Sequence, residues 1–318
     1  RVYYANHDLP RSIIMYFETA GIEVSVWVPP LVAFIVSLFT SMGGVSGAFL
    51  LMPFQMSVLG YATPSVSATN QLFNVVAIPS GVYRYVKEGR LVWPLAWAVI
   101  IGTLPGVILG AIIRVKYLPD PTNFKIFAGL VLAYIGLRMA RDIWKQKIKQ
   151  AGVINKSHSQ KNIGSPANTT VTLLNCTATS ISYEFSGDVY HCSRITIFLM
   201  SLVVGIVGGV YGIGGGAIVA PFFVSICGLP VYTVAGAALM GTLVTSVVGV
   251  AFYQILSAFY SAQSVAPDWI LGILFGTGGT IGMYCGARLQ KHVPAIYIKS
   301  MLCVIISGTA LSYIKNIF

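Results

Sequence analysis

Apolar stretches recur along almost the whole chain, and most of them carry no charged residue. A run of roughly 20 such residues is long enough to cross a hydrocarbon core about 30 Å thick as an α-helix. The pattern therefore predicts an all-α polytopic membrane protein. The stretches form two groups of five, namely 26–42, 45–59, 64–83, 91–113 and 122–140, then 195–211, 214–227, 231–256, 269–287 and 295–314.

A polar segment, 141–193, separates the two groups. It begins with several basic residues, and its later part, Thr170 to Tyr190, alternates Thr, Ser, Tyr and Val in a way typical of strands. We expect a small sheet or hairpin there, with a linker of modest structure as the alternative. The expected domains are an N-terminal extracytoplasmic segment (1–25), a first transmembrane repeat (26–140), this cytoplasmic linker (141–193) and a second repeat (194–318).

The two groups are related to each other by sequence. An offset of 168 positions aligns the start of the second group with the first and superimposes glycine and proline positions. Coincident glycine and proline positions on one register are hard to obtain from composition alone and indicate an internal duplication. The matching pairs include Gly44 with Gly212, Gly47 with Gly215, Pro53 with Pro221 and Gly81 with Gly249.

An odd number of crossings in each half would make the second half inverted relative to the first. Lys and Arg then collect on one side, which the positive-inside rule makes cytoplasmic, so both termini are expected outside. The more basic side receives Arg84, Lys87, Arg90, Arg138, Arg141, Lys145, Lys147, Lys149, Lys156, Lys161, Arg194, Arg288, Lys291 and Lys299; the other receives Arg1, Arg11, Arg114, Lys116, Lys125 and Lys315.

Composition agrees with a membrane location. Of the 318 residues, 56% are hydrophobic and only 9% are charged, which is far too little charge for a soluble domain of this size. The formal net charge of +11 would suggest nucleic acid as a partner of a soluble protein. Here the cations lie between apolar stretches and no nucleic-acid motif is present, so a lipid bilayer is the expected partner.

Two glycine-rich segments carry the candidate chemistry. Ser41 to Pro53 reads SMGGVSGAFLLMP, and its counterpart, Gly209 to Pro221, reads GVYGIGGGAIVAP. Short, glycine-interrupted segments in corresponding positions of two halves indicate a transporter binding site. Helices that restart near Ser46 and Gly214 would direct free N–H groups and positive dipole ends at an anion near the middle of the bilayer. The alternative is that these glycines only permit close helix packing.

Polar side chains on the stretch after each break are expected to face this site. Ser67, Asn70, Gln71 and Asn74 form one helical face, and burying carboxamides in lipid without partners would be costly. Each hydroxyl alone could instead bond to helix backbone. The predicted substrate-binding residues are Gly44, Ser46, Gly47, Asn70, Gln71, Asn74, Gly214, Gly215, Gly216, Thr242 and Thr245, and the predicted vestibule or gating residues are Arg84, Tyr85, Tyr253 and Gln254.

Other residue types exclude several kinds of function. All nine carboxylates and all four histidines lie outside or at the edges of the apolar stretches, which disfavours a metal site or an intramembrane carboxylate relay. No catalytic dyad lies at membrane depth, so neither an enzyme nor a cofactor is expected. Cys227, Cys285 and Cys303 are interpreted as small hydrophobic residues, while Cys176 and Cys192 share the polar segment and could reach one another.

Four runs resemble one known family, the TauE/SafE sulfite exporter family, also called the 4-toluene sulfonate uptake permease family. They are the glycine-rich stretch through Pro53, ATNQLFN at 68–74, YGIGGGAIVAP at 211–221 and GARLQK at 286–291. The resemblance implies a secondary transporter in a prokaryotic plasma membrane, with a homodimer as one option. It also implies alternating-access export of a small sulfur-containing anion, such as sulfite or the organosulfonate sulfoacetate.

Two alternatives to such an exporter stay open from the sequence. One is an anion channel of the same architecture, and the other is a transporter for a different anion. The membrane potential favours export, because each negative charge that leaves an inside-negative cell gains roughly 2.3 kcal/mol per 100 mV.

Overall fold

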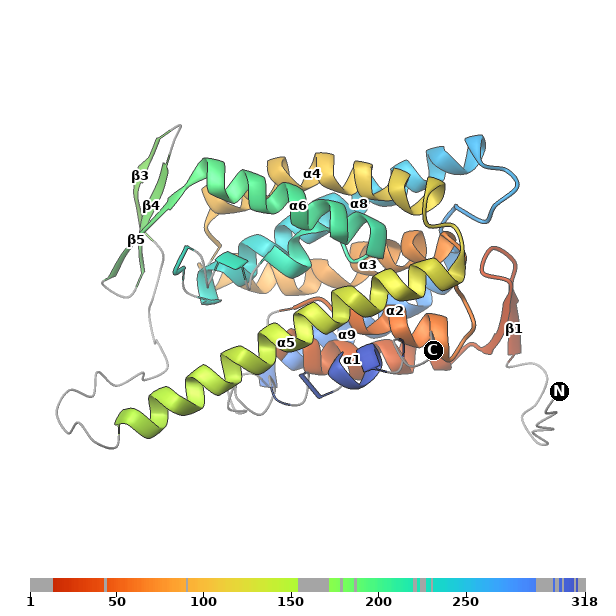
Figure 1. Cartoon of the computed structure of the whole chain (residues 1–318), viewed down its shortest axis with the longest axis horizontal. Coiled ribbons are helices and arrows are strands. Elements are labelled where there is room, and N and C mark those ends of the chain that lie inside the picture. Colours follow the sequence, from red (N-terminus) through yellow and green to blue (C-terminus); the bar gives the residue numbers. More distant parts are fainter. Residues whose placement is uncertain are drawn as a thin grey trace.

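The computed structural model is a bundle of long helices with a β-hairpin near one end and a small sheet near the other (Figure 1). It describes residues 14–42, 45–89, 91–153, 172–177, 180–185, 188–219, 222–223, 227–229, 231–289, 300, 303–304, 306–311 and 313. The helices are α1 (Val28–Met42), α2 (Ala48–Ser57), α3 (Ser65–Lys87), α4 (Trp93–Lys116), α5 (Pro121–Val153), α6 (Arg194–Tyr211), the 3₁₀ helix η2 (Gly215–Ile218), α8 (Val231–Phe259) and α9 (Trp269–Leu289).

Four of the described helices are long and apolar enough to cross a membrane. They comprise residues 93–116, 194–211, 233–259 and 269–286, in α4, α6, α8 and α9. Large apolar side chains on these helices point outward, as lipid-facing residues do, and Trp97 of α4 is 57% exposed. These helices confirm a multi-pass membrane protein.

The helix contacts have the symmetry that a duplicated chain would give. On the 168-residue register α1 corresponds to α6 and α3 to α8, and α9 follows α8 as α4 follows α3. The most extensive contacts are those of α4 with α6 and of α1 with α9, which exchange when the halves are exchanged. The same holds for α3 with α9 and α8 with α4, while α3 and α8 pack against each other. Each half therefore completes the other.

Glycine stripes make the two largest helix contacts possible. On α4 a Cβ at Gly106 would lie 2.5 Å from the backbone oxygen of Leu202 on α6. On α9 a Cβ at Gly278 would collide with the backbone of Pro30 on α1. Helix backbones approach this closely only where small residues line the contact. These helical glycines therefore permit close helix packing, which is the role that the sequence analysis gave as the alternative for the glycine-rich breaks.

The N-terminal segment and the polar segment between the two groups of apolar stretches both contain β-structure. β3 (Thr172–Cys176), β4 (Ser180–Phe185) and β5 (Asp188–Ser193) form an antiparallel three-stranded sheet in the order β3-β4-β5, which confirms the predicted sheet. β1 (Ile14–Phe17) and β2 (Ile22–Ser25) form a hairpin that the expectation of an all-α fold missed. The first residues of the predicted linker belong instead to α5, because that helix continues to Val153.

The sheet is tied to the second half by a disulfide and a hydrogen bond. Cys192 of β5 is bonded to Cys227. The expectation that Cys192 could pair with Cys176 is therefore wrong. The interpretation of Cys227 as a small hydrophobic residue is wrong for the same reason. The Tyr183 hydroxyl lies 2.8 Å from Thr233 Oγ1 at the start of α8. Burial raises the pKa of Tyr183 to about 12, because the phenolate would lose its hydration.

Candidate functional site

The polar face of α3 is buried at the centre of the bundle. Ser67, Asn70, Gln71 and Asn74 recur at helical spacing, and each is 0% exposed. α3 contacts α8 and α9 of the other half, which keeps this face away from lipid. Because buried carboxamides are costly without partners, the hydrogen bonds of these side chains indicate what the face does.

Asn74 joins the two breaks, which are the irregular backbone just before α2 and the irregular backbone just before η2. Its Oδ1 accepts a hydrogen bond from Ser46 Oγ at 2.5 Å, just before α2. Its Nδ2 donates to the backbone oxygen of Ile213 at 2.9 Å, just before η2, and lies 3.3 Å from Ser246 Oγ of α8. One side chain of the first half therefore holds the irregular backbone of both halves.

In the first half the break ends with Gly47 directly before α2, and Gly44 lies outside the described residues. The Ala48 N–H donates to Ser46 Oγ at 3.3 Å, which satisfies one amide of the first turn. Asn70 Nδ2 donates to the Ala48 oxygen at 2.9 Å, and Gln55 Nε2 donates to Asn70 Oδ1 at 3.4 Å. The start of α2 is thus attached to the polar face of α3.

The break in the second half differs from the expected helix start. The left-handed φ values of +78° at Gly212 and +74° at Gly214 turn the chain after α6, a conformation that favours glycine. A four-residue 3₁₀ helix follows, and the N–H of its first residue, Gly215, donates to Thr245 Oγ1 at 3.2 Å. This amide is already used, so it could bind an anion only by giving up Thr245 Oγ1, and the predicted anion site at Gly214 stays a prediction.

The three consecutive glycines also serve packing. A Cβ at Gly214 would lie 2.8 Å from Thr242 Cγ2, and one at Gly216 would lie 2.6 Å from Thr242 Oγ1. The Thr242 hydroxyl donates to the backbone oxygen of Ala238 at 2.8 Å. Thr242 and Thr245 therefore line the break closely, and both hydroxyls donate to backbone oxygens of α8, which agrees with the alternative that single hydroxyls bond to helix backbone.

Gln71 differs from its neighbours on α3. It is 0% exposed, and neither its Nε2 nor its Oε1 has a hydrogen-bond partner among the residues that the structure describes. Its carboxamide lies over Gly249 of α8, where a Cβ would be 2.6 Å from Gln71 Cδ. A buried polar group without a partner is costly, so its presence needs a physical explanation.

The predicted vestibule residues do not gather in one place. Arg84 pairs with Glu88 at 2.8 Å near the end of α3, and Tyr85 packs beside Gly236. The buried Tyr253 donates its hydroxyl to the Gly209 oxygen at 3.1 Å.

Gln254, the fourth predicted vestibule residue, is exposed. Its Oε1 accepts from Trp269 Nε1 at 3.3 Å. Gln254 therefore stands apart from the buried polar face of α3.

Arg114, which the sequence analysis assigned to the less basic side of the membrane, is a buried cation. It is 0% exposed, and its guanidinium donates to the oxygens of Leu118 and, at 3.1 Å, Ala62. The same group lies 3.8 Å from the centre of the Phe124 ring. Its position in the last turn of α4, four residues before the carbonyl of Leu118, could have indicated a helix C-terminal cap.

Metal ligands do not gather in the part of the chain that the structure describes. No three His, Cys, Asp or Glu side chains come together within these residues. Carboxamides, hydroxyls and backbone groups are what the buried cluster offers a ligand.

Spanning helices and two related breaks that meet on a buried polar face define a multi-pass membrane transport protein. The family model described as "Sulfite exporter TauE/SafE" matches residues 30–313. The chain therefore belongs to the TauE/SafE family, as the four sequence runs indicated. Searches of curated proteins and of solved structures found no match.

Proposed function

We propose that this chain is a secondary transporter that exports a small sulfur-containing anion, sulfite or an organosulfonate such as sulfoacetate, by alternating access. The anion would bind beside the polar face of α3, where the two breaks meet. Membership of the TauE/SafE family supports the sulfur-containing anion as the class of substrate.

The observation that carries the proposal is the unpaired carboxamide of Gln71. A buried polar group left without a partner costs about 1–3 kcal/mol, so a chain that keeps one needs a reason. Gln71 lies one helical turn from Asn74, which holds both breaks. An anion that accepted a hydrogen bond from Gln71 Nε2 would remove the part of this cost that comes from the unpaired Nε2, and it would contact the irregular backbone of both halves.

Neutral donors suit a transporter better than a buried cation would. Carboxamide and hydroxyl protons stabilise sulfonate or sulfite oxygens without fixing a full positive charge in the site, so the ligand can leave again. The buried guanidinium of Arg114 already donates to two backbone oxygens and lies over the Phe124 ring. Selectivity would then depend on shape and on the number of acceptor oxygens.

We place the β3-β4-β5 sheet in the cytoplasm of a prokaryote on the distribution of Lys and Arg, with the second half inverted. A reducing cytoplasm would hold Cys192 and Cys227 as thiols, although the structure pairs them. A membrane-impermeant thiol reagent, applied to intact cells after an impermeant reductant has opened any exposed disulfide, tests this orientation. Labelling of either cysteine before permeabilisation would reverse it.

The transport test uses proteoliposomes loaded with labelled sulfite or sulfoacetate. The wild-type protein should release the anion at a rate that saturates with concentration, and Gln71→Ala should reduce that rate at least tenfold, to about the level that loss of a buried hydrogen bond implies. Gln254→Ala is the matched control, because this glutamine is exposed and bonded to Trp269. Rates that never saturate would indicate a channel, and equal rates in both variants would remove Gln71 from the site.

A further inference from the structure

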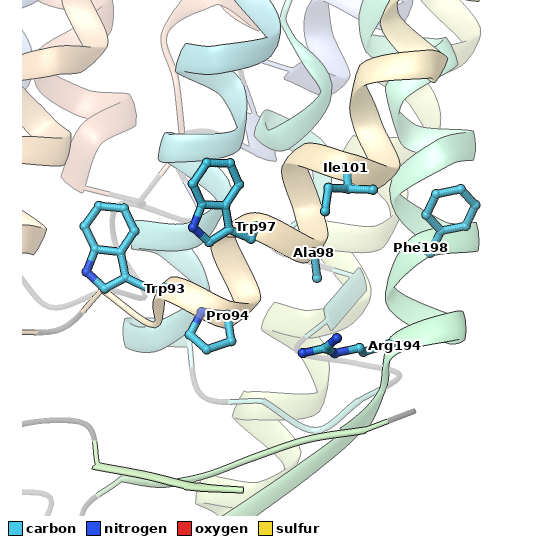
Figure 2. Close-up of a pocket in the computed structure, with 7 residues that line it drawn as sticks. All are labelled: Trp93, Pro94, Trp97, Ala98, Ile101, Arg194 and Phe198. Carbon is cyan, nitrogen blue, oxygen red and sulfur yellow. The ribbon is translucent and has the colours of Figure 1, made fainter. Parts of the chain in front are cut away.

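A groove on the outer surface of the bundle lies between α4 and α6. It has a volume of about 500 Å³, and its walls are Trp93, Pro94, Trp97, Ala98 and Ile101 of α4 with Arg194 and Phe198 of α6. Figure 2 shows the two tryptophans along α4, with the Arg194 side chain extending from the start of α6 toward the α4 side. The groove thus bridges the two halves of the protein.

The position of this groove on two spanning helices indicates that it faces lipid. Both helices are among those long and apolar enough to cross a membrane. Trp97 and Ile101 are more than half exposed, and Phe198 is 38% exposed. Exposed side chains of this kind on a spanning helix face acyl chains, and tryptophans mark the level of the lipid headgroups.

Arg194 adds charge to an otherwise apolar wall. Among the described residues that line the groove it is the charged one, and no carboxylate is included. It is the first residue of α6, and Ser193 before it makes no side-chain cap hydrogen bond, so the positive end of the helix adds to the same potential. A guanidinium at headgroup level beside a tryptophan pair is complementary to a phosphate that carries acyl chains.

We propose that this groove binds one anionic phospholipid, with the phosphate on Arg194 and an acyl chain along Trp97, Ile101 and Phe198. The lipid would contact α4 of the first half and α6 of the second at one end of the glycine-lined contact that joins them. A bound lipid would therefore stabilise the association of the two halves. The inference does not depend on the transported substrate.

The experiment uses the detergent-purified full chain and two lipids, phosphatidylglycerol and the zwitterionic phosphatidylcholine. Native mass spectrometry should show phosphatidylglycerol retained on the protein. Phosphatidylglycerol should also raise the melting temperature of the protein more than phosphatidylcholine does. Arg194→Gln should weaken phosphatidylglycerol binding about fivefold, while the control Arg288→Gln, at an exposed site on α9, should not.

Trp97→Ala tests the apolar wall, and Trp144→Ala, at an exposed position on α5, is its control. Trp97→Ala should lower lipid retention without changing the melting temperature of the lipid-free protein. Equal binding of both lipids, or a loss as large in Arg288→Gln as in Arg194→Gln, would overturn the proposal.

Two further outcomes would assign the groove to another ligand and so also overturn the proposal. Inorganic phosphate that reproduced the thermal shift would show that no acyl chain is bound. Conversion of a dimer to a monomer by Trp97→Ala, with lipid retention unchanged, would make the groove a contact between two copies of the chain.

Discussion

Gly249→Ala tests the candidate site with the smallest possible change. A methyl group on Gly249 would lie 2.6 Å from Cδ of the Gln71 side chain and closer still to its Oε1. Ordinary carbon contacts need about 3.5 Å, so the carboxamide must move by about 1 Å. The displaced atoms form the far end of a flexible side chain, so the helix should keep its place while the carboxamide turns away.

The first half offers a matched control at the corresponding position. Gly81 aligns with Gly249 on the 168-residue register, and among the described residues a Cβ at Gly81 would meet Leu239 Cδ1 alone, at an ordinary 3.6 Å. Both changes replace glycine by alanine inside a helix, which alone stabilises the helix by about 1 kcal/mol. Differences between the two variants therefore report the Gln71 carboxamide and not helix propensity.

Transport should separate these two variants. A misplacement of about 1 Å in a positioning group can cost about a hundredfold in rate. Proteoliposomes with Gly249→Ala should export sulfite or sulfoacetate at least tenfold more slowly than wild type, and Gly81→Ala should match wild type. Melting temperatures in detergent should stay within a few degrees of wild type for both. Unchanged flux in a folded Gly249→Ala protein would refute the assignment of Gln71 to the site.

Three other changes test the surrounding structure. Asn74→Asp keeps the acceptor for the first break but places a negative charge against a backbone oxygen, so anion flux should disappear, and flux that persists would separate Asn74 from the site. Gly106→Ala should lower the unfolding free energy by about 2 kcal/mol because its methyl would meet the α6 backbone, whereas Gly308→Ala should not, because no described residue comes within 4 Å of a Cβ there; equal melting temperatures would contradict the close contact. Arg114→Lys keeps the charge but loses the two-pronged donor, so the melting temperature should fall, and an unchanged value would mean that the bonds to Leu118 and Ala62 add nothing.

Sequence patterns predicted the membrane class and the family because these depend on local composition. The long apolar stretches became the spanning helices, and alternating Thr, Ser and Tyr residues became the β3-β4-β5 sheet. The pairing of Cys192 with Cys227 escaped prediction because it depends on where the chain after η2 lies in space relative to the sheet. The hairpin at 14–25 is too short for alternation to distinguish it from a loop.

Within the candidate site, sequence identified the residue types better than their roles. Helical spacing placed Asn70, Gln71 and Asn74 on one face, and this face is buried as expected. Spacing cannot show which amide hydrogen bonds are already used. Thr245 takes the N–H of Gly215, and this removes a donor that the pattern of glycines had assigned to the anion.

The hydrogen bonds of Asn74 suggest how the proposed ligand binding could be coupled to movement. In this structure its carboxamide is bonded at once to the break before α2 and to the break before η2, so neither break can move away from α3 without losing a hydrogen bond. A buried donor or acceptor left unpaired costs about 1–3 kcal/mol, and an anion next to Gln71 could supply a replacement acceptor for the Asn74 Nδ2. Ligand binding would then lower the cost of separating the breaks, which is the differential affinity for two conformations that alternating access requires.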